Sequence, residues 1–90
     1  MKKEFATRSN ERGIPLYFES SDLGLVSALV SIGWEIKSID KTDRKKVKFI
    51  FPNSEELSEM TEKYWNKELE IDARTFFEDQ KMLKNRIYSK

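Results

Sequence analysis

The sequence predicts a single small α+β domain whose elements follow the order β-α-β-β-α-α. Apolar residues alternate with polar ones over three short stretches, as in half-buried strands, and recur at helical spacing over three longer stretches. A chain of 90 residues is long enough for one domain with one modest core. We therefore expect a three-stranded sheet with the helices packed on one of its faces.

The first and third strands are predicted at residues 14–18 and 46–51. The second strand is expected to begin with Trp34 and Ile36, before a polar turn at residues 40–45. In the first strand, Leu16 and Phe18 lie on the same, inward-facing side. In the third strand, alternation directs Val47, Phe49 and Phe51 inward. Lys46 and Lys48 of that strand are expected to face outward.

A polar turn joins the second and third strands into a hairpin, whereas a helix joins the first and second strands. The first two strands should therefore run parallel, with the third strand between them and antiparallel to both.

Each helix is marked by residues that favour helix ends. The first helix begins after Asp22, which can cap it, and ends at Gly33, which accepts a left-handed conformation. Asn53, with Glu56 three residues later, has the pattern of a capping box for the second helix. Asp72 caps the third helix.

The third helix is expected to bury a broad face and to follow a helix that ends in a left-handed residue. Asn66 is the residue best suited to that conformation. The apolar residues of the third helix recur on one side. They are Ala73, Phe76, Phe77, Leu83 and Ile87.

Residues 1–13 are polar and aperiodic, which predicts a flexible N-terminal arm before a single domain at residues 14–90. The most apolar run, residues 23–32, is too short to span a bilayer. The chain contains no cysteine that could form a disulfide. We expect a cytoplasmic protein with no membrane partner, present as a monomer or a small homo-oligomer.

The charges are segregated along the chain, although the formal net charge is only +1. Residues 34–48 and 73–90 each carry a net charge of +3, whereas residues 54–72 carry −5. Such blocks can simply attract one another within a fold. The acidic block would also repel a bound nucleic acid unless it faced away from it.

Two basic segments are candidates for contact with nucleic acid. A projecting cationic β-ribbon can lie along phosphates, and a helix edge with lysines and a tyrosine offers charge and a stacking ring. The same residues are also typical of a solvated turn and of the rim of a core. The candidates are Lys41, Arg44, Lys45, Lys46 and Lys48 in the hairpin, and Arg74, Lys81, Lys84 and Tyr88 in the third helix.

The second helix offers a different surface, suited to a protein partner. Glu55, Glu59 and Glu62 lie along one face of this helix. A ladder of this kind is usually a solvated helix face, but it can also contact another protein. Trp65 lies at the edge of the apolar stripe, where it either covers the following segment or anchors a partner, because tryptophan is enriched at interface hot spots.

The residues that most enzymes depend on are missing. The chain contains no histidine and no cysteine, and so lacks the commonest general base and a thiol nucleophile. Asp22, Glu35 and Lys37 follow the order of the magnesium site in one class of nucleases, but Asp22 is better explained as a helix cap. We expect no catalytic residues, no metal site and no cofactor.

The last third of the chain has a more distinctive residue order. It contains Tyr64-Trp65-Asn66 and then Lys81, Leu83-Lys84 and Arg86-Ile87-Tyr88. With these blocks, residues 15–90 resemble a small uncharacterised domain family associated with bacteriophages, prophages and other mobile elements. The resemblance implies a genomic setting and no activity, because the family carries a domain-of-unknown-function label.

Two functions of different classes are compatible with these features. We favour a non-catalytic accessory binding protein of a phage or mobile element, which contacts nucleic acid through the basic hairpin and the third helix. The alternative is a protein-binding adaptor or inhibitor, for instance of a host defence or replication factor. In that case the acidic second helix would be the contact surface.

Overall fold

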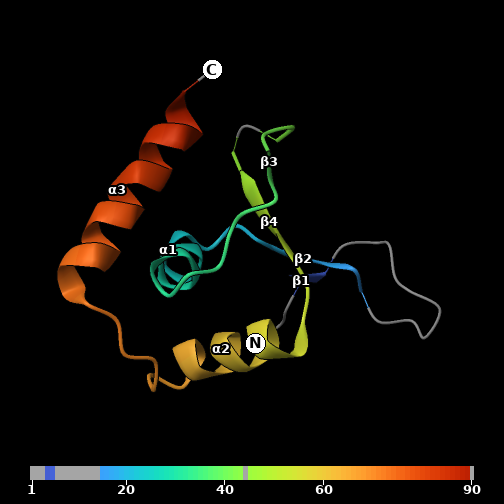
Figure 1. Cartoon of the computed structure of the whole chain (residues 1–90). Coiled ribbons are helices and arrows are strands. Elements are labelled where there is room, and N and C mark those ends of the chain that lie inside the picture. Colours follow the sequence, from blue (N-terminus) through green and yellow to red (C-terminus); the bar gives the residue numbers. More distant parts are fainter. Residues whose placement is uncertain (1–3, 6–14, 44, 90) are drawn as a thin grey trace.

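The computed structural model describes residues 4–5, 15–43 and 45–89 of the chain. It contains an antiparallel sheet in the order β1-β2-β4-β3, with the helices on one side of it (Figure 1). The elements are β1 (Glu4–Phe5), β2 (Tyr17–Ser20), α1 (Leu23–Ser31), β3 (Ser38–Asp40), β4 (Lys48–Pro52), α2 (Glu55–Trp65) and α3 (Ala73–Tyr88). The α+β class and the predicted order from β2 to α3 are confirmed.

The two-residue strand β1 was not predicted. It pairs antiparallel with β2 and gives the sheet a fourth strand at this edge. It falls within the segment that we expected to be a flexible arm, and the rest of that segment lies outside the described residues. Pairing with β1 covers part of an edge that the three-strand prediction left open.

The arrangement of the three longer strands agrees with the prediction. Strands β2 and β3 both pair antiparallel with β4, so β4 lies between them and the other two run parallel. Phe18 on β2 lies opposite Phe51 on β4, with their ring centroids 6.4 Å apart. Phe49 and Phe51 are buried, because alternation along β4 directs both toward the helices.

Helix α1 lies between the sheet and α3 (Figure 1). Its buried residues Val26 and Leu29 belong to the same core cluster as the phenylalanines of the sheet. Asp22 caps the helix as predicted, since its carboxylate accepts a hydrogen bond from the Leu25 N–H at 3.1 Å. Gly33 follows the helix with φ of 109°, a conformation that side chains disfavour.

Helix α3 contacts the core through a narrow stripe, which corrects the prediction of a broad buried face. Leu83 is fully buried, and Phe76 and Ile87 are half-buried. Ala73 is exposed, and 63% of Phe77 is exposed, because Phe77 lies about 120° around the helix from Leu83. The helix packs mainly against α1, so only one side of it is covered.

Two predicted strand positions were displaced. Strand β2 begins three residues after the predicted start, and Leu16 precedes it in a bend with 42% of its surface exposed. Trp34 and Ile36 are half-buried but precede β3, which begins only at Ser38. Both residues pack against the core from a link that is not part of the sheet. The alternation of apolar and polar residues here therefore reflects burial and does not indicate a strand.

Two predicted helix-end residues were wrong by one position. Ser54, not Asn53, caps α2, and its hydroxyl accepts a hydrogen bond from the Leu57 N–H at 3.1 Å. Asn53 instead donates its side-chain amide to the Pro15 carbonyl at 2.9 Å. The left-handed residue after α2 is Lys67, with φ of 62°, and not Asn66.

Replacing Leu83 with alanine should lower the free energy of unfolding by about 2–5 kcal/mol, because it removes the one fully buried side chain of α3 and leaves a cavity. Urea denaturation followed by circular dichroism measures this loss. The matched control is Phe77→Ala on the exposed side of the same helix, for which a change within about 0.5 kcal/mol is expected. Equal losses in the two variants would contradict the packing of α3.

Candidate nucleic-acid interface

Lys41 connects the hairpin to the end of α3. It directly follows β3, and its Nζ donates hydrogen bonds to the carbonyls of Arg86 and Ser89 at 2.6 and 2.7 Å. Carbonyls at a helix C-terminus lack partners within the helix and carry partial negative charge, so an ammonium group is favourable there. The contact holds the described part of the basic hairpin (residues 41–43 and 45–48) beside the last turn of α3.

Two aspartates shape the hairpin turn. Asp40 accepts a hydrogen bond from the Thr42 N–H at 2.9 Å, and Asp43 accepts one from the Lys45 N–H at 2.9 Å. The hydrogen bonds from Thr42 hold the pKa of the Asp40 carboxyl below its usual value. The anionic side chains of this segment are therefore used to form the turn, while Lys45 is exposed.

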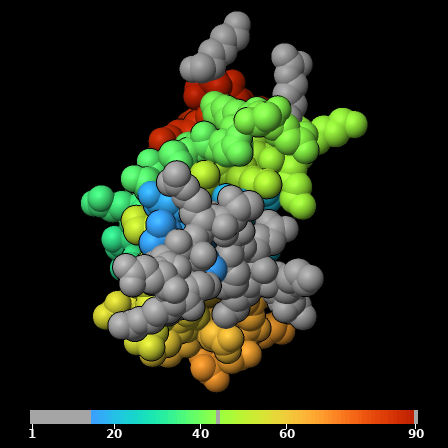
Figure 2. All heavy atoms as spheres, turned by 90° about the vertical axis from the view of Figure 1, so that its right-hand side faces the viewer, coloured from blue at the N-terminus to red at the C-terminus, as the bar shows by residue number. Residues whose placement is uncertain are grey.

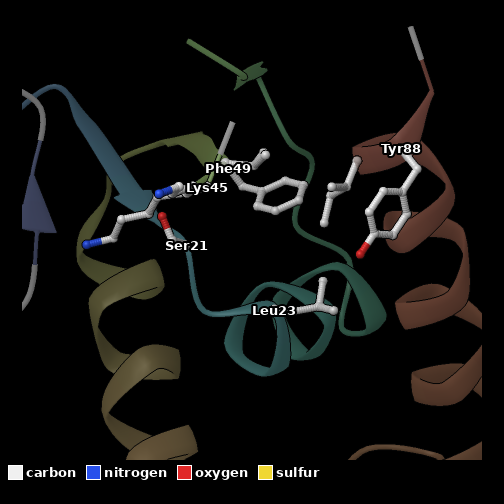
Figure 3. A pocket seen from close by; sticks show the side chains of 8 residues that line it. Ser21, Leu23, Lys45, Phe49 and Tyr88 are labelled. Carbon is white, nitrogen blue, oxygen red and sulfur yellow. The ribbon is translucent and has the colours of Figure 1, made fainter. Parts of the chain in front are cut away.

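A pocket of about 250 Å³ lies between the basic hairpin, the start of α1 and the end of α3. Figure 3 shows Tyr88 on α3 at one side of it, Phe49 and Lys45 at the other side, and Leu23 of α1 below. It is lined by Ser21 and Leu23, by Lys45, Lys46, Val47 and Phe49, and by Ile87 and Tyr88. The basic hairpin and the third helix, which were predicted as two separate contact segments, thus meet at one pocket.

The pocket combines apolar walls with cationic and hydroxyl groups. Leu23 and Ile87 supply apolar surface, and Lys45 and Lys46 supply positive charge. The Ser21 hydroxyl oxygen is buried without a hydrogen-bond partner among the described residues. The volume is slightly below the 300–1,000 Å³ or so of pockets for drug-sized ligands, so the pocket suits a small flat group with a polar or anionic edge.

Three of the predicted contact residues have other partners. Lys41 binds the end of α3, Arg74 pairs with Glu78 on the same helix at 3.2 Å, and Lys48 lies 4.0 Å from Glu19. Lys48 alternates with the inward-facing Phe49 and therefore points to the opposite face of the sheet. Arg44 lies outside the described residues.

The other candidates on α3 form a row that includes an unpredicted residue. Lys81, Lys84 and Tyr88 are exposed on the side of α3 that flanks its buried stripe. Phe77 belongs to the same row, although its apolar character led us to place it in the core. Its spacing of four residues from Lys81 was the available signal.

The acidic helix α2 and the basic hairpin lie at opposite ends of the molecule. Figure 2 shows the hairpin and the end of α3 together at one end and α2 at the other. Glu55, Glu59 and Glu62 are exposed on α2. The acidic helix therefore lies far from the cationic pocket. A nucleic acid bound at the pocket would then be little repelled by the net charge of −5 on residues 54–72.

Trp65 is partly integrated into the fold. Its ring lies edge-on to Tyr64 with centroids 5.0 Å apart, and 39% of its surface is exposed. Tyr64 in turn packs against the core and lies close enough to α1 that a Cβ on Gly24 would approach its hydroxyl oxygen to 2.6 Å. Burial and the nearby Asp22 carboxylate raise the pKa of Tyr64. Trp65 thus contacts Tyr64 and remains partly exposed.

The nuclease-like residues do not assemble into a site. Asp22 caps α1, Glu35 is exposed, and Lys37 Nζ lies 5.6 Å from the centre of the Tyr17 ring. Among the residues that the structure describes, no three histidine, cysteine or acidic side chains form a group that could hold a metal ion. Within the same residues, no helix is long and apolar enough to cross a membrane.

Replacing Lys41 with methionine should destabilise the last turn of α3 by about 1 kcal/mol, because its terminal carbonyls lose a cationic donor. Amide hydrogen exchange at residues 86–89 should accelerate about fivefold. Lys45→Met is the matched control in the same hairpin and should leave this exchange unchanged. Unaltered exchange in the Lys41 variant would refute the capping role.

The comparisons with known proteins concern the family of the chain. Neither the curated proteins nor the solved structures gave a match. A family model described as a domain of unknown function (DUF5659) matches residues 16–89, which include every element from β2 to α3. The chain therefore belongs to this family of uncharacterised domains.

Proposed function

We propose that this protein is a non-catalytic nucleic-acid-binding protein whose contact surface is the basic hairpin together with the end of α3. The observation that carries the proposal is the contact of Lys41 with the Arg86 and Ser89 carbonyls. Through this contact the hairpin and the end of α3 lie side by side and can act as one basic surface. Separate cations on a protein surface contribute little, whereas cations that converge can follow a phosphate backbone.

The charge distribution supports this surface over α2. Lys45 and Lys46 line the pocket, and Lys81 and Lys84 are exposed along the adjoining helix. The acidic helix lies at the far end of the molecule, so a bound phosphate backbone meets a positive field and avoids the negative one (Figure 2). The alternative, an adaptor that binds a protein through α2, lacks a comparable convergence of groups.

The setting that we propose is that of an accessory protein of a phage or mobile element acting in the cytoplasm. It rests on the resemblance of the last third of the chain, and membership of an uncharacterised family is compatible with it. A small protein with a cationic surface suits a role in coating, positioning or protecting nucleic acid. That role requires affinity and tolerates low sequence specificity.

The double replacement Lys45→Gln, Lys46→Gln should weaken the binding of a fluorescein-labelled oligonucleotide. The slope of log K against log salt concentration should fall by about 0.7–0.9 for each phosphate that the two lysines no longer neutralise. Fluorescence anisotropy across a salt series gives both quantities. The matched control is Lys48→Gln, because Lys48 lies on the opposite face of the sheet beside Glu19.

The Lys48→Gln control distinguishes loss of the assigned contact surface from a general effect of lower net charge. Equal losses in the Lys48 variant and the double variant would indicate a nonspecific effect of net charge and would contradict the assigned surface. Full affinity in the double variant would also contradict it. If reversal of Glu55 and Glu59 on α2 abolished a protein complex that survived nuclease, the adaptor function would replace the one proposed.

A further inference from the structure

Two exposed aromatic rings and two lysines lie in one row on α3. At about 100° per residue, Phe77, Lys81, Lys84 and Tyr88 (the α3 row) fall within about 60° of one another. The exposed fractions of Phe77 and Tyr88 are 63% and 83%. Glu78 lies about 60° from Lys81, at the border of the row, and pairs with Arg74 at 3.2 Å. Asp79 lies about 160° from Phe77 and accepts a hydrogen bond from the Ser31 hydroxyl at 3.0 Å.

The two rings have little part in holding the fold together. Neither Phe77 nor Tyr88 belongs to the core cluster or to the partly buried residues that pack against it, although Ile87 beside Tyr88 does. An isolated exposed aromatic residue would call for no explanation. Two exposed rings aligned with two lysines present apolar faces and positive charge together.

This combination is complementary to single-stranded nucleic acid. Exposed bases stack on aromatic rings whatever their sequence, and lysines neutralise the phosphates between them. A duplex keeps its bases stacked inside the helix and would use only the lysines. The rings therefore distinguish single strands from duplexes, which the charge alone does not do.

The dimensions of the row suit a short stretch of strand. From Phe77 to Tyr88 the helix rises about 16 Å, which matches about five nucleotides at 3.4 Å per stacked base. Tyr88 also lines the pocket that contains Lys45 and Lys46. A strand that follows the α3 row thus arrives at the pocket, where the apolar walls of Leu23 and Ile87 can accept one base.

The negative end of the helix macrodipole would oppose a phosphate backbone at this point. The ammonium of Lys41, bound to the Arg86 and Ser89 carbonyls, offsets that charge where the row meets the pocket. Lys41 thus places a positive charge at the point where the row meets the pocket.

We infer that α3 is a stacking platform for single-stranded nucleic acid, with bases on Phe77 and Tyr88, phosphates at Lys81 and Lys84, and one base in the adjoining pocket. The inference rests on the proposed function and specifies its ligand. It assigns to Phe77 a role in binding that its place in the sequence did not suggest.

The test measures the affinities of a labelled dT12 strand, an rU12 strand and a 12-base-pair DNA duplex by fluorescence anisotropy. The double variant Phe77→Leu, Tyr88→Leu should bind both single strands about 30-fold or more weakly, because the loss of each ring lowers the affinity about fivefold or more. It should bind the duplex as the unaltered protein does. Phe77→Tyr, Tyr88→Phe should restore single-strand binding because it keeps both rings. Met82→Ala, which changes an exposed residue about 140° from Phe77, should have no effect.

The outcomes separate this inference from the proposed function. Single-strand affinity that survives the loss of both rings, but falls in the variant of Lys45 and Lys46, would overturn the stacking platform and leave the cationic surface standing. Equal loss for the duplex and the single strands would likewise overturn it. If the unaltered protein bound none of the three probes, both the platform and the proposed function would fail. Unchanged circular dichroism spectra are the control for folding.

Discussion

The contact between Lys41 and the end of α3 is the interaction on which the candidate site depends. Helix α3 is the outer layer of the molecule, packed mainly on α1 through Leu83 and its half-buried neighbours. In the last turn of the helix, the half-buried Ile87 packs against the core. The ammonium of Lys41 adds a polar restraint by binding the terminal carbonyls at 2.6 and 2.7 Å.

This dependence links the core to the surface. Because α1 lies between the sheet and α3, the helix bearing the exposed rings is kept one layer away from the strands (Figure 1). Its narrow buried stripe leaves most of its circumference accessible, including Phe77 and Tyr88. The acidic helix α2 lies at the end of the molecule opposite the hairpin (Figure 2). Positive and negative charge are thereby separated in space as they are in the sequence.

Much of the fold could be predicted from the sequence because its determinants are local. Asp22 caps the start of α1 and Gly33 follows its end, as their residue types predict. Alternation along β4 identified Phe49 and Phe51 as core residues. The errors arose where a tertiary contact competes with a local preference. The side chain of Asn53 donates to the Pro15 carbonyl, so Ser54 caps α2. This arrangement depends on the segment before β2, which is distant in the sequence.

The candidate site could be predicted only in part. The basic hairpin and the third helix were both identified, but nothing in the sequence indicated that Lys41 joins them. Alternation along the third strand correctly placed Lys48 on the outer face of the sheet, where it lies beside Glu19. It also placed Lys46 there, but Lys46 precedes β4 and lines the pocket. Phe77 was misplaced because an apolar residue next to Phe76 suggests a broad buried face. Only the width of the contact between α1 and α3 determines which of the two phenylalanines is covered.

We propose that the basic hairpin and the end of α3 act as one nucleic-acid contact surface. A titration of the ¹⁵N-labelled protein with dT12, followed by amide chemical shifts, tests this most directly. We expect the amides of residues 45–49 and 77–89 to shift together with a single dissociation constant, while those of residues 55–65 in α2 stay unchanged. Shifts confined to α2, or different dissociation constants for the hairpin and α3, would contradict it.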